Sequence, residues 1–185
     1  MEELETLLVR HCAPTLAGMK TGGLFNYIAD PDCKFENQIQ KWNVLLNPRG
    51  VVIKILLREK DRRLVYVYRP GKLEEDFRCS GVSEFLADMG YDCGEMGACL
   101  LHLARRIHES DSFPHEIGLF LGYPLHDVRG FIENAGQNCK CCGMWKVYCD
   151  ESQTQKLFEK FKKCTKIYCQ CLQKGSSVKQ LTVAA

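Results

Sequence analysis

Hydrophobic residues recur at helical spacing along much of the chain, and this pattern predicts a series of amphipathic helices. The clearest stripe contains Phe35, Ile39, Trp42 and Leu46, which would all lie on one side of a helix. The first helix is expected to end near Pro14, because proline interrupts helical hydrogen bonding. Helices are predicted at residues 2–10, 35–46, 72–77, 82–89, 94–109, 124–134 and 151–172.

Runs of β-branched and aromatic residues predict strands between these helices. GVVIKILL (50–57) and LVYVYR (64–69) flank the charged turn REKDRR, so we expect them to pair as a hairpin. HEIGLFLG (115–122) is short and apolar, which predicts a buried strand, and MWKVYC (144–149) alternates as a strand does. With a helix between the last two, residues 116–149 would form a strand–helix–strand crossover.

The order of these elements favours an α/β or α+β fold, with helices packed on a small mixed sheet of about four strands. The chain has 185 residues, 45% of them hydrophobic, which suits a single compact domain that buries its own core. We predict that this domain spans residues 1–173. Residues 174–185, KGSSVKQLTVAA, are expected to form a flexible C-terminal tail.

The charge balance argues against a nucleic-acid-binding protein, because 25 Lys and Arg residues stand against 23 Asp and Glu residues. No apolar run approaches the ~20 residues of a membrane-spanning helix. The N-terminal sequence MEELETLLVRHC is acidic and differs from a secretory signal. We therefore expect a cytoplasmic protein without nucleic-acid or membrane partners, which leaves a protein partner or a small ligand.

Cysteine is the most conspicuous residue type, with 12 copies, of which seven lie between positions 139 and 171. Cys139 and Cys142 have the C-x-x-C spacing that aims two thiolates at one metal ion. A four-ligand site needs a second pair, and the last predicted helix offers Cys164 and Cys169. Soft thiolate ligands select zinc, copper(I) or iron–sulfur groups. The sequence leaves the cofactor unknown, with zinc, iron or an iron–sulfur cluster as candidates.

The same cysteines admit other interpretations. The second pair lacks C-x-x-C spacing, and cysteine is often buried as a small hydrophobic residue without a chemical role. Cys141 and Cys142 are adjacent and are plausible acceptors of oxidation or of a persulfide, while Cys149 ends the last predicted strand. Our leading interpretation is a cytoplasmic thiol-rich binding protein that holds a soft metal, an iron–sulfur cluster or a sulfur-carrying group through these cysteines.

A small enzyme with a cysteine nucleophile is the alternative class. Cys12, expected just after the first helix, and Cys142 are the candidate nucleophiles, and His11 or His115 would act as the base. HEIGL does not begin an H-E-x-x-H zinc motif, because its last residue is leucine. A non-catalytic protein-interaction module is a third possibility.

The turn after the predicted strand at 115–122 offers a candidate binding site. Ligands of open α/β sheets bind at the carboxyl ends of parallel strands. Tyr123 and His126 would border a crevice at such an end, so they are the candidate cofactor-binding residues.

Several blocks of the chain resemble an uncharacterised family found mainly in clostridia and related anaerobic Firmicutes. These blocks are HCAPTLAGMKTGGLF, LVYVYRPGKLEEDF, FPHEIGLFLGYPLHDVRGFIEN, and GMWKVYCD followed by KFKKCTKIYC. The resemblance spans residues 11–169, so it implies one domain. It also implies a bacterial, cytosolic and often anaerobic setting, which suits a thiol-rich chain, and it implies no mechanism.

Overall fold

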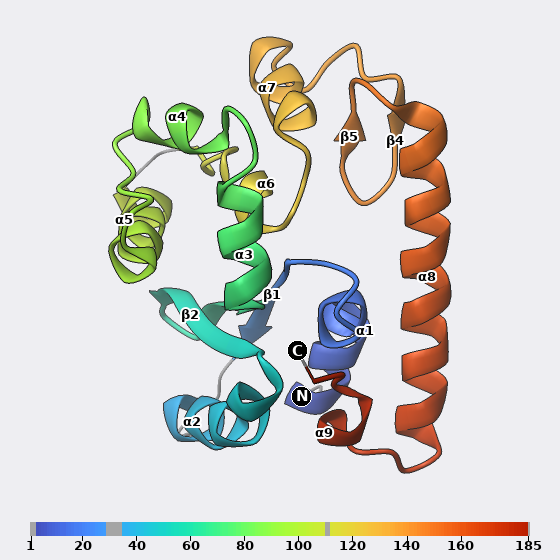
Figure 1. Ribbon diagram of the computed structural model, residues 1–185. Helices are drawn as coiled ribbons and strands as arrows, with labels where there is room; N and C mark the ends of the chain where they lie inside the picture. The colour runs from blue at the N-terminus through green and yellow to red at the C-terminus, as the bar shows by residue number, and fades with distance from the viewer. Residues whose placement is uncertain (1–2, 29–34, 110–111, 185) are drawn as a thin grey trace. The chain divides into compact units, whose positions relative to one another are not determined.

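The computed structural model describes residues 3–28, 35–109 and 112–184 (Figure 1). The chain divides into two compact units. The first unit combines residues 1–73 with residues 163–185, and the second contains residues 74–162.

Helices and strands occur in both units, so the predicted α+β class is confirmed. The strands form a three-stranded sheet and a separate two-stranded ribbon, both antiparallel, in place of one mixed sheet. The single domain over residues 1–173 stays a prediction.

The first unit is built on a sheet in which β3 is the central strand. β2 and β3 form the predicted hairpin, with Val52 opposite Tyr68. β1 pairs with the other edge of β3 and was not predicted, because Gly22 and Gly23 weaken its strand pattern. The strands are β1 (Gly22–Ile28), β2 (Val52–Glu59) and β3 (Arg62–Tyr68).

Helices α1 (Leu4–Leu16) and α2 (Phe35–Leu46) share one hydrophobic core with this sheet. The bounds of α2 agree with the prediction, and its first residue, Phe35, stacks on Tyr27 with 4.2 Å between ring centroids. A short 3-10 helix, Asn47–Arg49, follows at the predicted turn. Fully buried members of the core include Leu8, Val9, Leu16, Phe35, Leu46, Val51, Val65 and Val67.

Helix α1 continues past Pro14 to Leu16, so the predicted helix end is wrong. Pro14 lies in the last turn, where it removes a single intrahelical hydrogen bond. Burial of Ala13 and Leu16 on the core outweighs that loss. Cys12 is therefore an internal residue of the helix. The prediction that it lies just after the helix is wrong.

The C-terminal residues of the first unit are anchored at several points. Helix α9 (Val178–Leu181) begins with a capping box, and the Val178 side chain is fully buried in the core. The buried guanidinium of Arg69 donates hydrogen bonds to the carbonyl oxygens of Leu16 and Val183, both at 2.7 Å. The segment predicted as a flexible tail thus carries a helix and a buried side chain, while its mobility stays a prediction.

Helices dominate the second unit, and most lie close to their predicted positions. α3 and α8 each contribute residues to both units. The elements are α3 (Pro70–Phe77), α4 (Val82–Ala87), α5 (Met96–Glu109), α6 (Ile117–Phe120), α7 (Leu125–Glu133), β4 (Cys141–Cys142), β5 (Lys146–Val147) and α8 (Glu151–Gln173).

Residues 115–122 do not form the predicted strand. They contain the one-turn helix α6, whose four residues are all buried. Burial was predicted correctly, but a short and uniformly apolar run does not distinguish a buried strand from a buried helical turn. The predicted strand at 144–149 is reduced to β5, which pairs antiparallel with β4, so the predicted parallel crossover over 116–149 is also wrong.

A buried polar cluster joins α5 to the turn before α6. Glu116, which is 2% exposed, accepts hydrogen bonds at Oε1 from the Tyr91 hydroxyl (2.9 Å) and from Arg106 Nε (2.5 Å). Burial and the nearby Glu116 carboxylate raise the pKa of Tyr91. The ion pair lets a carboxylate be buried at the start of an apolar turn.

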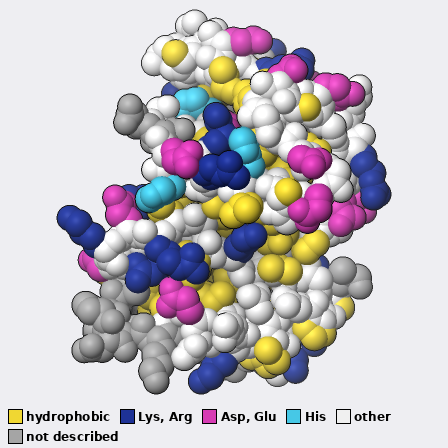
Figure 2. All heavy atoms as spheres, turned by 90° about the vertical axis from the view of Figure 1, so that its left-hand side faces the viewer, with side chains coloured by type: hydrophobic (Ala, Val, Ile, Leu, Met, Phe, Trp, Pro, Cys, Tyr) yellow, Lys and Arg dark blue, Asp and Glu magenta, His cyan; other side chains and the backbone are white. Residues whose placement is uncertain are grey.

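Within the described residues, none of the helices combines the length and the hydrophobicity that crossing a lipid bilayer requires. Figure 2 shows one face of the molecule, on which Lys and Arg side chains are interspersed with Asp and Glu. This mixture agrees with the formal net charge of +2.

Candidate functional site

Asp127 fixes the residues after β5 against the first turn of α7. Its side chain is buried, and both carboxylate oxygens accept hydrogen bonds. Oδ2 accepts from the Trp145 indole N–H (2.8 Å), and Oδ1 accepts from the backbone N–H groups of Tyr148 (2.7 Å) and Cys149 (3.3 Å). Three N–H donors offset the cost of burying this charge. The loop that carries Cys149 is thereby held against the helix that carries His126.

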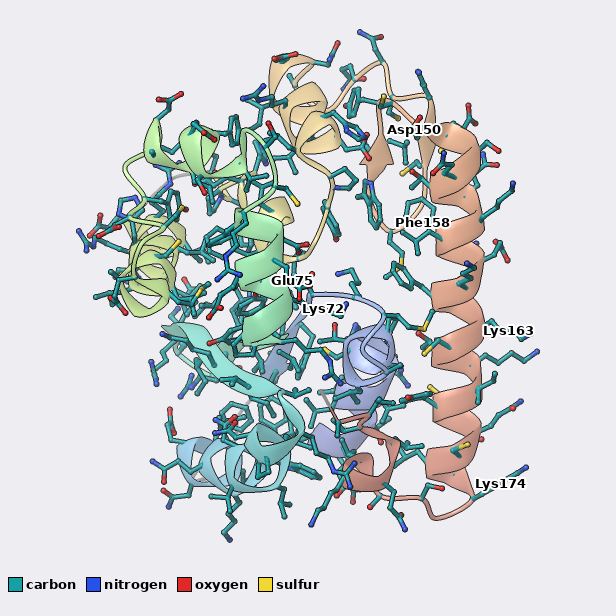
Figure 3. The ribbon with its side chains drawn as sticks, viewed as in Figure 1. Lys72, Glu75, Asp150, Phe158, Lys163 and Lys174 are labelled. Carbon is teal, nitrogen blue, oxygen red and sulfur yellow. The ribbon has the colours of Figure 1, made fainter. Side chains whose placement is uncertain are left out.

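Aromatic packing supports the same ribbon from the side of α8. Trp145 meets Phe158 edge to face and stacks on Tyr123, with 4.5 Å between ring centroids in both pairs. Figure 3 shows Asp150 at the start of α8 and Phe158 pointing from this helix toward the ribbon. Glycine is required at position 143, because a Cβ there would lie 2.3 Å from the Phe158 ring.

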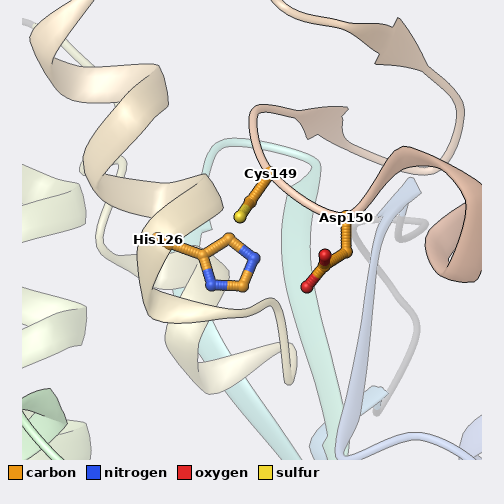
Figure 4. A group of neighbouring side chains, drawn as sticks. All are labelled: His126, Cys149 and Asp150. Carbon is orange, nitrogen blue, oxygen red and sulfur yellow. The ribbon is translucent and has the colours of Figure 1, made fainter.

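His126, Cys149 and Asp150 converge beside the Asp127 anchor (Figure 4). His126 lies in the first turn of α7, and Cys149 and Asp150 directly precede α8. One ligand atom from each, an imidazole nitrogen, a thiol sulfur and a carboxylate oxygen, lies within 4.8 Å of the other two. In the part of the chain that the structure describes, no other group of three His, Cys, Asp or Glu residues brings its ligand atoms this close.

The three side chains form a mixed nitrogen, sulfur and oxygen donor set that suits a borderline-soft cation such as Zn²⁺. Ligand atoms at about 2.0–2.3 Å from a tetrahedral zinc ion lie about 3.5 Å apart. All three side chains are exposed and their ligand atoms already lie within 4.8 Å of one another, so side-chain rotation can bring them to this spacing. Three protein ligands would leave a fourth position open to water or to a substrate.

The four cysteines predicted as metal ligands lie on different elements. Cys142 belongs to β4 and Cys139 shortly precedes it, whereas Cys164 and Cys169 lie on α8. The first two belong to the second unit and the last two to the first. Cys164 is buried, which raises its pKa, while Cys142 is exposed. A single metal site built from all four stays a prediction.

Tyr123 and His126, the predicted cofactor-binding residues, border two different cavities in the second unit. Tyr123 lines a cavity of about 300 Å³ together with His115 and Cys142, and His126 lines the other, with Trp145 bordering both. Burial raises the pKa of Tyr123 to about 12. The parallel strand that was expected to border the binding site is not formed. The cavities lie instead beside the helical turn α6 and the β4–β5 ribbon.

Cys12 and His11, the remaining catalytic candidates, belong to α1 in the first unit. Cys12 is fully buried, and this burial raises the pKa of its thiol to about 12. A thiol in this environment is protonated near neutral pH, which disfavours a nucleophilic role. His11 is exposed and stacks on Phe25 with 5.6 Å between ring centroids.

The chain belongs to the DUF3793 family, described as proteins of unknown function, and matches it over residues 8–182. The predicted resemblance to an uncharacterised family is therefore confirmed, while its clostridial range stays an expectation. No curated protein and no solved structure matched the chain.

Two of the three converging residues, His126 and Cys149, are among those that the sequence singled out. Asp150 was missed, because an acidic residue directly before a helix is usually explained as a cap. Asp127 was missed as the anchor, because its partners lie about twenty positions further along the chain. The signal for Asp150 in the sequence was its position beside Cys149, directly before a long amphipathic helix.

Proposed function

We propose that this protein binds a borderline-soft divalent metal ion, such as Zn²⁺, through His126, Cys149 and Asp150. The convergence of three different ligand atoms within 4.8 Å carries the proposal. The proposed site retains the thiolate ligand that the sequence suggested, and this ligand is now Cys149. The four predicted cysteines, Cys139, Cys142, Cys164 and Cys169, form the competing donor set.

The surroundings of Cys149 favour this assignment. Its backbone N–H is held by Asp127 (3.3 Å), and its carbonyl oxygen accepts hydrogen bonds from Lys140 Nζ (3.0 Å) and the Glu151 N–H (2.9 Å). Its side chain is exposed, so the backbone is fixed while the sulfur can rotate toward an ion. Buried partners that orient a ligand commonly raise metal affinity.

Metal binding by a thiolate requires a reduced thiol. The eleven cysteines among the described residues are all free. A reducing cytoplasm, which we propose as the location of the protein, keeps such thiols available. The open fourth coordination position would allow either a binding or a catalytic role.

Titration of the reduced protein with Co²⁺ under anaerobic conditions tests the proposal. Bound Co²⁺ reports thiolate ligation by a charge-transfer absorption band, and added Zn²⁺ should displace it. We expect the band to disappear in Cys149→Ser and to weaken in His126→Ala. The matched control is Cys79→Ser, which removes an exposed cysteine of the same unit and should leave the band unchanged.

A second variant separates the two donor sets. The double variant Cys139→Ser/Cys142→Ser should retain the cobalt band if the metal binds to His126, Cys149 and Asp150. Loss of the band in the double variant and its survival in Cys149→Ser would assign the metal to the other cysteines. A wild-type protein that shows no band at stoichiometric Co²⁺ would contradict metal binding by either set.

A further inference from the structure

The cavity beside Tyr123 has the size and composition of a small-molecule site. Its volume of about 300 Å³ lies at the lower end of the usual range for ligand pockets. The cavity lies wholly within the second unit. Its wall includes Phe113, His115, Tyr123, Phe131, Trp145 and Lys146.

Five of the thirteen residues that line the cavity carry aromatic rings, and apolar surface of the wall is open to solvent. Tyr123 stacks on Trp145, with 25° between the ring planes, and Phe131 meets the His115 ring at 4.8 Å between centroids. Phe113 is 45% exposed and Met144 is 40% exposed, which is high for large apolar side chains. A flat apolar ligand would cover this surface and stack on the rings.

Lys146 supplies a positive charge at the same wall. Its ammonium donates a hydrogen bond to the Gly136 carbonyl oxygen (2.5 Å) and lies 5.8 Å from the centroid of the Phe131 ring. A lysine ammonium has three N–H donors, so this contact leaves donors for a ligand. Across the described ranges, no carboxylate forms an ion pair with Lys146.

Asp127 also lines the cavity, and its negative charge has to be weighed against that of Lys146. Both Asp127 oxygens face N–H donors from Trp145, Tyr148 and Cys149, which compensate its charge. The charge of Lys146 is met only by a neutral carbonyl oxygen and a ring. The balance at the wall therefore favours an anionic group next to Lys146.

We propose that this cavity binds a small planar aromatic carboxylate, with its ring between the aromatic side chains and its carboxylate on Lys146. The site is separate from the proposed metal ligands, since neither His126, Cys149 nor Asp150 lines it. Cys142, which is exposed and lies on the wall, would be covered by the bound ligand.

Equilibrium dialysis with 2-naphthoate, compared with the neutral 2-naphthamide of the same shape, tests this assignment. We expect Lys146→Met to weaken 2-naphthoate binding about tenfold, as for the loss of one hydrogen bond to a charged group. Binding of 2-naphthamide should be unchanged in this variant, which also shows that the cavity is still folded. The control is Lys162→Met, which removes an exposed lysine that does not line the cavity.

Alkylation of Cys142, followed by mass spectrometry of its peptide, tests the location. Saturating 2-naphthoate should slow alkylation of Cys142 and leave that of Cys79 unchanged, because Cys79 is exposed and lies outside this cavity. The proposal is overturned if 2-naphthoate does not bind saturably. It is also overturned if Lys146→Met binds it as tightly as the wild type, or if Cys142 is not protected.

Discussion

Cys12 and Cys149 show how differently the two units of this protein surround a thiol. Cys12 lies inside α1 and is fully buried, packed so close to Gly23 of β1 that a Cβ there would lie 2.7 Å from its sulfur. Cys149 lies in the loop before α8, with its backbone hydrogen-bonded and its sulfur exposed. Abundance of cysteine therefore says little about chemistry, because packing decides which thiols can ionise and bind a metal.

The largest expected difference between these two thiols is in alkylation rate. Burial raises the pKa of Cys12 to about 12, so at pH 8 its thiolate is about a thousandfold scarcer than that of a thiol with the ordinary pKa of 9.0. We expect the exposed Cys149 to react with iodoacetamide much faster than Cys12, as measured by mass spectrometry of the two peptides over time.

The raised pKa of Cys12 also fixes how its alkylation rate should change with pH. Because the protonated Cys12 thiol is the form stabilised by folding, its reaction in the native protein should keep accelerating as the pH rises toward 12. In urea, Cys12 and Cys149 should react at similar rates. Similar rates in the native protein at pH 8 would show that the two regions do not differ as described.

Asp127→Ala tests whether the exposed thiol depends on a buried anchor. The variant leaves the Trp145 indole N–H and the Tyr148 and Cys149 backbone N–H groups without their acceptor. We expect the free energy of unfolding in urea to fall by about 3 kcal/mol, as for loss of hydrogen bonds to a buried charge. Cobalt affinity should also fall about tenfold or more, since an orienting partner of a ligand is lost.

The matched control for this change is Asp88→Ala, which removes an exposed carboxylate of the same unit and should alter the free energy of unfolding by less than about 0.5 kcal/mol. Equal stability of the Asp127 and Asp88 variants would mean that the loop is not held by Asp127.

Gly23→Ala tests the close packing around the buried thiol, and its expected effect is the smallest. The new Cβ would lie 2.7 Å from Cys12 Sγ and 3.1 Å from the His11 carbonyl oxygen. We expect the free energy of unfolding to fall by about 2 kcal/mol, the usual result of overpacking a core. Thermal and urea denaturation measure it directly.

A second substitution shows which contact is responsible. In the Cys12→Ala background, Gly23→Ala should cost less, because the sulfur that it would meet is absent. Gly71→Ala is the control, since a Cβ at that position meets nothing within 4 Å. An unchanged cost in the Cys12→Ala background would assign the strain to the backbone of α1 instead.

Local patterns predicted the elements that depend on local information. The helical stripe that begins at Phe35 and the β2–β3 hairpin follow from periodicity and a charged turn, and both are confirmed. Residues 115–122 were predicted as a strand because their burial leaves no periodicity to read. Pro14 was given too much weight, since the core contact made by Leu16 lies outside any local rule.

The candidate site could be predicted only in part, for a related reason. His126 and Cys149 were singled out separately, one as a ligand contact and the other as a thiol. Their meeting depends on the tight β4–β5 turn and on the bonds from Asp127 to Tyr148 and Cys149. Such long-range hydrogen bonds leave no periodic signal in one sequence.

The discontinuity of the first unit has a consequence for synthesis of the chain. Residues 74–162 are contiguous, so the second unit can fold as soon as they leave the ribosome. The first unit lacks residues 163–185 at that time, and with them the buried Val178 side chain and the Val183 carbonyl that Arg69 binds. Its N-terminal residues precede the second unit in the chain, yet its core is completed only after residues 163–185 have also left the ribosome.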